Sequence, residues 1–539
     1  MTAFGMARRA SKAALGGWIL ALMVWSADSF ATTYFVNDSR TNGDVYTTFA
    51  GSDGNSGLSN SAPKLSITNL LATYFVSTGD VVYIDTGVYS NYTVTITNQG
   101  SGVSPVIFQG STNFAAGGTV IDRRGSAEAL LLVSAHSVQL FDLVCRGGSI
   151  GVYVFGTTNA DLTRVYAVSN TTGFLFQNCI NNRIRQSVAA RNTVGIQGTG
   201  LGPLFWDYCV LWSNSTAMAL TSTLTLSNSV VLGGTLLGTQ YPAAMDYNAF
   251  WSVNLGLDSL AELSQFRTNL FFSTWADPMF ADPAGLDFHP RSVVGRFNPL
   301  TGFYVTDTVH SALIDLGDPA RSFANEPSPN GSNVNVGIFG NTAEASLSRT
   351  NLPWLYAISY NDGGELTATG VLRWTYGNMT NGATVSIQYS PGGGGPLWSN
   401  LAVGVAVTNR SFLWTATNAV PNIGAFWRVQ LESNTSIWDA CDANFVLRAH
   451  PTNAFTLYVN DGSTNGDSYC QAAGSATNTG VTATSPRHSL QSILDSYDLG
   501  PDDVVLEIGT GTGSLTALMA QRAGGVVTVE LDSQLHQLA

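Results

Sequence analysis

Charged residues are scarce in this chain. Only 11% of its 539 residues are Asp, Glu, Lys or Arg, against about a quarter in an average globular protein. The 23 basic residues are outnumbered by 36 acidic ones, so the chain lacks the basic footprint of a dedicated nucleic-acid-binding protein. Hydrophobic residues nevertheless make up 44% of the chain, which excludes a disordered acidic polymer.

Cysteine and long apolar runs are also rare. Five cysteines exclude a disulfide-dense scaffold. Beyond residue 31 no apolar run reaches the ~20 residues that a membrane-spanning helix needs, so we expect no membrane span in the mature chain. Glycine (56 residues) and the aromatics (12 Trp, 19 Tyr and 26 Phe) are abundant. Together with the low charge, they predict a turn-rich, mainly β protein.

The N-terminus has the pattern of an export signal. Three basic residues, Arg8, Arg9 and Lys12, precede the short apolar stretch Ala13–Trp25, and small residues follow at Ser29 and Ala31. We interpret residues 1–31 as a signal peptide that is cleaved after Ala31; an uncleaved anchor is the alternative. This predicts a protein that is secreted, periplasmic or on the cell surface.

A repeat of 22 residues dominates the first part of the chain. Glycine follows this step at Gly151, Gly173 and Gly195, and asparagine follows it at Asn170, Asn192 and Asn214. Apolar residues at the same step alternate with polar ones, as strands require. The pattern predicts a stacked β-solenoid, because propeller blades need ~40–50 residues each.

This repeat resembles that of the right-handed parallel β-helix family, which includes pectate lyases and other polysaccharide-active proteins. The resemblance covers about Thr33–Ser348 and implies a pectin-lyase-like β-helix over residues 32–350, with a cap at its N-terminal end. It also implies polysaccharide as a ligand or substrate, although it is more specific for the fold than for a reaction.

A second, longer repeat links the two ends of the chain. Thr33–Asp38 recurs as Thr456–Asp461, and the shift of 423 residues holds without a gap as far as Val505. We interpret both copies as β-helix caps with one strand, a polar loop and a short helix, which lies near Ile67–Tyr74 in the first copy. The second cap, residues 451–505, implies that a second solenoid once followed or was meant to.

The segment between the two caps changes character. Asp287–Gly340 has the pattern of a loop-rich end that closes the solenoid. Residues 351–450 then predict an immunoglobulin-like or fibronectin-like β-sandwich, from these strand-like segments: Thr367–Tyr376, Thr384–Ser390, Phe412–Thr415 and Phe426–Leu431. Four tryptophans lie on or near them: Trp374, Trp398, Trp414 and Trp427. We interpret them as core residues, with exposed platforms for sugar rings as the alternative.

The last residues, 506–539, follow a different pattern. A strand leads into a turn with Gly509, Gly511 and Gly513, then a helix-like segment and a strand that ends at Glu530. This order is the opening of a Rossmann-like doubly wound sheet. Glycines allow the backbone to approach a ligand, and an acid ~20 residues further on can accept hydrogen bonds from ribose hydroxyls. The first copy reads Ile84–Gly87 where this one reads Ile508–Gly511, so part of the motif could instead be cap sequence.

These flanking residues resemble the S-adenosylmethionine site of ribosomal RNA adenine dimethyltransferases. The resemblance implies S-adenosylmethionine as cofactor and RNA as partner, with Gly509 lining the methionine end of the cofactor site, Glu530 holding the ribose, and Gly511 and Gly513 in the same site. It covers only Val504–Ala539, whereas such a domain needs ~150–200 residues. We therefore expect an incomplete and inactive fragment, produced by a truncated or misjoined reading frame or by recombination.

The solenoid offers candidate chemistry without a decisive catalytic constellation. Four residues share one position in successive coils, namely Asp142, Arg164, Gln186 and Tyr208, and a second cluster contains Asp122, Arg123 and Arg124. Asp142 and Asp207, the other acid considered, do not share a coil position. β-Helix lyases use an Arg or Lys base with acids that hold Ca²⁺, and hydrolases use paired carboxylates. A groove lined by Asp and Arg within ~6 Å of each other would favour such an enzyme, and a solvated polar face is the alternative.

Metal sites have weaker patterns still. Asn37-Asp38 and Asp53-Gly54-Asn55 offer oxygen ligands for Ca²⁺, but turn formation explains them better. Cys145, Cys179 and Cys209 lack the spacing of metal ligands, and we expect two of them to lie on strands as small core residues. Three functions therefore stay open: an exported β-helix that binds polysaccharide, a β-helix lyase or hydrolase, and a ribosomal RNA adenine N6-dimethyltransferase.

Overall fold

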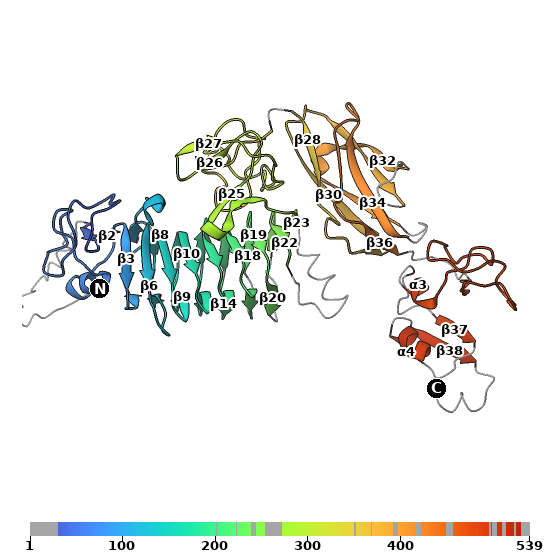
Figure 1. Ribbon diagram of the computed structural model, residues 1–539, viewed down its shortest axis with the longest axis horizontal. Helices are drawn as coiled ribbons and strands as arrows, with labels where there is room; N and C mark the ends of the chain where they lie inside the picture. The colour runs from blue at the N-terminus through green and yellow to red at the C-terminus, as the bar shows by residue number, and fades with distance from the viewer. Residues whose placement is uncertain are drawn as a thin grey trace, which may run out of the picture.

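A computed structural model gives the fold of the protein (Figure 1). It describes residues 31–200, 202–221, 224–238, 244–253, 272–349, 352–367, 369–391, 397–416, 422–448, 456–494, 497, 504–508, 514–521 and 524–529. Residues 1–30 of the predicted signal peptide lie outside the described residues. No helix within these ranges is long and apolar enough to cross a bilayer.

A parallel β-solenoid of about eight turns occupies residues 81–275, which confirms the predicted β-helix. Its longer sheet contains β1 (Thr33–Val36), β2 (Val81–Ile84), β3 (Gly87–Ser90), β5 (Val106–Gly110), β6 (Thr119–Asp122), β8 (Val138–Arg146), β10 (Asp161–Val168), β12 (Asn182–Arg185), β13 (Val188–Ala190), β15 (Leu204–Asp207), β16 (Val210–Trp212), β18 (Thr225–Ser227), β19 (Val230–Leu232), β21 (Ala244–Asp246), β22 (Ala249–Trp251) and β23 (Thr274–Trp275). The second sheet contains β4 (Val94–Ile96), β7 (Leu130–Val133), β9 (Ile150–Phe155), β11 (Thr172–Gln177), β14 (Val194–Thr199), β17 (Thr216–Leu220) and β20 (Thr235–Gly238).

The coils bend at residues with left-handed backbone. Asp142, Arg164, Gln186 and Tyr208, at steps of 22, have φ between 49° and 57°, and the row continues at Asn228 and Tyr247 after shorter steps of 20 and 19. Such a conformation costs a non-glycine residue ~1–2 kcal/mol, which the stacking of identical corners must offset. The 22-residue repeat is therefore confirmed for the middle coils, and the later coils are shorter.

The repeated glycines and asparagines lie where one coil touches the next. A Cβ atom on Gly173 would lie only 2.7 Å from the carbonyl oxygen of Gly195, so no larger residue fits there. Beside it, Asn192 donates through Nδ2 to the carbonyl oxygen of Ala167 (3.0 Å) and accepts at Oδ1 from the backbone N–H of Asn170 (2.9 Å). The ladder of buried asparagines thus joins successive coils through backbone groups.

Apolar side chains fill the inside of the coils. Trp206 is fully buried, with its ring edge-on to Phe174 at 5.1 Å between centroids. Cys145, Cys179 and Cys209 are buried free thiols in the same core, which agrees with their interpretation as small core residues.

The loop-rich segment after the solenoid lies along its flank. We name residues 280–348 the side module; it contains β24 (Phe280–Asp282), β25 (Asp287–Pro290), β26 (Arg296–Asn298), β27 (Phe303–Val305) and the 3-10 turn η2 (Pro283–Gly285). Its apolar residues pack on an outward-facing row of the solenoid that includes Val188, Val210 and Val230. Figure 1 shows β25 beside the solenoid strands. We expected this segment to close the end of the solenoid, but it lies against the side of the coils. It does so because these coils carry apolar residues on an outer face as well as inside.

Residues 354–448 form two sheets around one core. The strands are β28 (Trp354–Ala357), β30 (Thr369–Gly377) and β33 (Ser411–Thr415) in one sheet, and β29 (Glu365–Thr367), β31 (Thr384–Ser390), β32 (Ser399–Ala406), β34 (Asn422–Leu431), β35 (Trp438–Ala440) and β36 (Phe445–Arg448) in the other; the turn η3 is Val407–Asn409. Trp374, Trp414 and Trp427 are buried in the shared core, whereas Trp398 is partly exposed. Core packing thus explains three of the four tryptophans, and the immunoglobulin-like assignment stays a prediction.

The two caps share the same internal hydrogen bonds. In the first, Asn37 Nδ2 donates to the carbonyl oxygen of Arg40 and to Asp44 Oδ2; in the second, Asn460 Nδ2 donates to Ser463 and Asp467 in the same way, at 3.0 and 2.6 Å in both copies. The helices of the two caps are α1 (Ile67–Thr73), close to the range predicted, and α3 (Leu490–Leu494). The repeat with a shift of 423 residues is therefore present in the structure as well as in the sequence.

The asparagine ladder generates a stability prediction. Asn192→Ala removes the partner of two buried backbone groups of the preceding coil, the carbonyl of Ala167 and the N–H of Asn170, so we expect the free energy of unfolding to fall by about 3 kcal/mol. The matched control, Thr193→Ala, changes an exposed side chain in the same corner and should change stability by less than about 0.5 kcal/mol. Urea unfolding followed by circular dichroism measures the free energy of unfolding of both variants. An equal loss in the two would contradict a stabilising role for the asparagine ladder.

Candidate functional site

The corner residues of the solenoid are brought together as predicted, but they bind one another. Asp142 is fully buried and receives two bonds from Arg164, Nε to Oδ1 at 2.5 Å and Nη2 to Oδ2 at 2.8 Å. Gln109 Nε2 donates to the same carboxylate at 2.7 Å. The hydrogen bond to Asp142 raises the pKa of the Arg164 guanidinium. This pair is therefore a structural ion pair rather than an open catalytic one.

Further along the row, the side module covers the corner residues. The amide of Gln186 reaches the carbonyl oxygen of Gly340 at 3.5 Å, and Tyr208 is 8% exposed. A Cβ atom on Gly340 would lie 2.7 Å from the ring of Tyr208, which shows how closely the two segments meet. Of the four predicted corner residues, Asp142 and Tyr208 are buried, Arg164 is bonded to Asp142, and Gln186 is bonded to Gly340.

Asp207 forms another polar contact between the solenoid and the side module. Its Oδ1 accepts from Asn228 Nδ2 at 3.0 Å, and its Oδ2 lies 3.4 Å from Arg321 Nη2. Burial raises the pKa of this carboxyl group. Because Arg321 follows Asp207 by more than a hundred residues, the repeat pattern could not have identified this pairing.

An open face with acids and arginines lies on the other side of the corner row. Asp161 on β10 pairs with Arg185 on the next coil, and the guanidinium of Arg183 stacks over Phe205 at 5.7 Å. Both arginines are exposed. This face therefore also brings Asp and Arg of adjacent coils within ion-pair distance.

The second predicted cluster, around Asp122, also forms ion pairs. Asp122 Oδ2 lies 3.4 Å from Arg124 Nε and 3.0 Å from Arg146 Nη2. Arg146 comes from the adjacent coil, and the Nε atom of Arg123 is buried without a hydrogen-bond partner among the described residues. The cluster thus joins coils in the same way as Asp142 and Arg164.

The oxygen-rich loops considered for Ca²⁺ are used inside the cap. Asp53 Oδ1 accepts from the backbone N–H groups of Leu65 and Ser66, at 3.2 and 3.0 Å, just before α1 begins. Asn37 holds its own loop through three bonds. Across the described ranges, no group of three or more His, Cys, Asp or Glu side chains is arranged to hold a metal ion.

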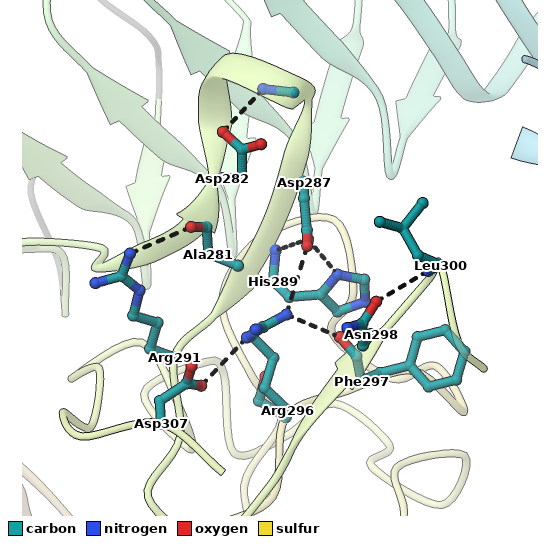
Figure 2. A network of polar contacts seen from close by, with 12 residues as sticks. Ala281, Asp282, Asp287, His289, Arg291, Arg296, Phe297, Asn298, Leu300 and Asp307 are labelled. Atoms are coloured by element: carbon teal, nitrogen blue, oxygen red, sulfur yellow. Dashed lines mark hydrogen bonds and ion pairs between the residues drawn. The ribbon is translucent and has the colours of Figure 1, made fainter. Parts of the chain in front are cut away.

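Figure 2 shows a polar network inside the side module, in which Asp287, His289 and Arg296 point toward one another. His289 Nδ1 lies 2.6 Å from Asp287 Oδ1, and the ring is stacked on Phe339 with only 1% of the residue exposed. Although burial opposes it, the hydrogen bonds and charge of His289, together with the charge of Arg296, lower the pKa of Asp287. An imidazole so enclosed positions strands rather than substrate.

Two further buried acids hold the loops of the side module. Glu326 Oε1 accepts from the backbone N–H groups of Asn335 and Asn341, both at 2.8 Å, and burial raises its pKa to about 7. Asp315 accepts from Ser348 Oγ at 2.8 Å, and burial raises its pKa to about 6. Ionisation of either acid therefore opposes folding of this segment.

The C-terminal segment forms a small parallel unit. The strands β37 (Val504–Ile508) and β38 (Gly525–Val529) pair in parallel from Val504 with Gly525 to Ile508 with Val529, and α4 (Ser514–Ala520) connects them. By the 423-residue shift β37 corresponds to β2, which pairs with the first cap, yet its partner here is β38. The proposed cofactor residues lie outside the described residues: Gly509, Gly511, Gly513 and Glu530.

Known proteins match the C-terminal segment. Residues 484–539 match the ribosomal RNA adenine dimethylase family. The ribosomal RNA small subunit methyltransferase A of Geobacter metallireducens is 49% identical over 49 residues, which cover 9% of this chain and 18% of that protein. The dimethyladenosine transferase of Saccharomyces cerevisiae is 47% identical over 45 residues, 8% of this chain and 14% of that protein. This chain thus spans less than a fifth of these relatives, and its resemblance to them is confirmed for the last residues.

Among solved structures, one similar protein is the GH136 lacto-N-biosidase from Eubacterium ramulus. Its alignment covers 45% of this chain and 67% of that protein, with 11% sequence identity and a TM-score of 0.27.

The buried acids predict a pH dependence. The folded pKa of Glu326 lies above its ordinary value of 4.5, so its contribution is fully present below about pH 4.5 and is lost as the pH rises through about 7. The loss amounts to at most about 3 kcal/mol. Glu326→Gln keeps the acceptor and should flatten this part of the stability curve.

Thermal unfolding of the protein and of the variant across this pH range measures the difference. Glu128→Gln, in a solenoid loop outside the side module, is the control and should keep the slope of the wild-type protein. An unchanged slope in Glu326→Gln would show that this carboxyl group does not titrate as described.

Proposed function

We propose that the C-terminal segment binds S-adenosylmethionine, as the cofactor-binding part of a ribosomal RNA adenine dimethyltransferase-like unit. The observation that supports this is the parallel unit β37–α4–β38, which falls within the residues that match that family. Ligands of parallel α/β sheets bind at the carboxyl ends of the strands. In the sequence, Gly509 and Glu530 follow directly after the paired residues Ile508 and Val529.

The residues fit the cofactor by their chemistry. A glycine after the first strand permits close approach of the backbone, and a carboxylate after the second can accept from both ribose hydroxyls. When bound, S-adenosylmethionine supplies a methyl group activated by a sulfonium centre. Methylation of adenine in ribosomal RNA, with RNA as partner, belongs to the relatives, and for this chain cofactor binding is the function proposed.

Titration of the full chain with S-adenosylmethionine by calorimetry tests this proposal. Glu530→Ala removes a charged acceptor, so we expect affinity to fall by about 10–100-fold. Gln521→Ala, an exposed change just after α4, is the matched control and should leave affinity unchanged. The proposal would be contradicted if the wild-type chain did not bind S-adenosylmethionine, or if Glu530→Ala and Gln521→Ala bound it with the same affinity.

A second function is proposed for the solenoid. The face with Asp161, Arg183, Arg185 and Phe205 supports binding of an acidic polysaccharide, because it combines exposed guanidinium groups with an aromatic ring along a stack of coils. A lyase or hydrolase acting there is the enzymatic form of this proposal. The export inferred from residues 1–31 would place such a protein outside the cytoplasm, at the cell surface or free.

A panel of acidic and neutral polysaccharides tests this face. Arg185→Ala removes one guanidinium and its pairing with Asp161, so affinity for acidic chains should fall by about 10-fold. The control, Arg40→Ala, removes an exposed arginine of the first cap and should have no effect. Unsaturated products would identify a lyase, and new reducing ends without them a hydrolase. If Arg185→Ala bound acidic chains as tightly as the wild type, the assignment of this face would be contradicted.

A further inference from the structure

An arginine on the outer face of the sandwich lies between two indole rings. The guanidinium carbon of Arg428, on β34, is 4.5 Å from the ring centroid of Trp398 and 5.1 Å from that of Trp438. Trp438 is 48% exposed, unlike the three core tryptophans. Stacking between two rings holds the guanidinium in one plane and orients its edge.

A row of amides fixes the same guanidinium from one side. The register of β32, β31 and β34 places Gln388 opposite both Asn400 and Arg428. Gln388 Oε1 accepts from Arg428 Nε at 2.5 Å, while Gln388 Nε2 donates to Asn400 Oδ1 at 2.9 Å. The Nε side of the guanidinium is therefore occupied, and its two Nη groups form the remaining edge.

Several arginines of the protein pair with a carboxylate, but among the described residues Arg428 does not. Arg164, Arg185 and Arg448 each pair with a carboxylate. Within the described ranges no carboxylate pairs with Arg428 and no acceptor meets its Nη groups. Burial lowers its pKa, since a partly desolvated charge without a partner is costly. An external anion of matching geometry would supply the missing interaction.

We propose that Trp398, Arg428 and Trp438 form a binding site for a glycan that carries uronate groups. The carboxylate of the uronate accepts two parallel hydrogen bonds from the Nη edge, the geometry in which arginine binds carboxylates. The apolar face of the sugar ring packs on the exposed side of Trp438, and the exposed amide of Asn400 lies in the same row for a hydroxyl group. The proposed ligand belongs to the same class as the ligand proposed for the solenoid face, but this site lies on the sandwich.

Calorimetric titration of the full chain with an oligomer of galacturonic acid and with its methyl ester tests the site without any mutation. Esterification removes the negative charge but keeps the sugar rings, so we expect the wild-type protein to bind the acid at least about 10-fold more tightly. Equal affinity for the two forms, or binding of neither, would overturn the proposal.

Variants locate the binding. Arg428→Lys keeps the charge but loses the planar fork, and Trp438→Ala removes the exposed ring, so each should weaken binding of the acid by about 10-fold. Arg410→Ala, which removes an arginine stacked on Tyr376 at 4.8 Å, is the control and should bind as the wild type does. Thermal unfolding verifies that every variant is folded.

The solenoid and the sandwich are separable in the same experiment. Loss of binding in Arg428→Lys but not in Arg185→Ala supports the sandwich site and contradicts the solenoid face. The reverse result supports the solenoid face and overturns the proposal made here. Loss in both variants supports two sites on one chain.

Discussion

The close stacking of one coil on the next is the constraint on which the rest of the structure depends. In three successive coils a glycine without a side chain allows backbone contact, and a buried asparagine bonds to peptide groups of the neighbouring coil. Because consecutive coils have the same left-handed backbone at the same place, corner residues with unfavourable φ stack on one another. The stacked coils form a scaffold, and the stacking does not fix which side chains lie on its outer faces.

One of these outer faces packs against the side module, and another is exposed to solvent. One side is apolar and is covered by the side module, whose buried acids Glu326 and Asp315 hold its loops. The opposite side keeps exposed arginines. The pairs Asp142–Arg164 and Asp122–Arg146 show that opposite charges on adjacent coils first serve to join the coils. Arg185 pairs with Asp161 across coils in the same way, whereas Arg428 pairs with no carboxylate among the described residues.

The sequence predicted the fold better than the sites, for a physical reason. Stacking imposes a fixed step on Gly173 and Asn192, so their spacing alone revealed the solenoid, and the second cap repeats the bonds of the first. Contacts between distant segments impose no such step. Nothing in the spacing indicated that Arg321 would meet Asp207 or that the side module would lie along the flank. The glycine-rich turn and Glu530 were recognised by resemblance, and their role stays a prediction.

The most direct measurement of the stacking is a crosslink between coils. Leu175 on β11 lies opposite Gln197 on β14, and Gln197 lies opposite Ala219 on β17. Adjacent strands are ~4.8 Å apart, within the span of a disulfide, whereas two steps are not. Cysteines at positions 175 and 197 should therefore form a disulfide on oxidation, and cysteines at 175 and 219 should not. Failure of the first pair, or equal crosslinking of both, would contradict the 22-residue stacking.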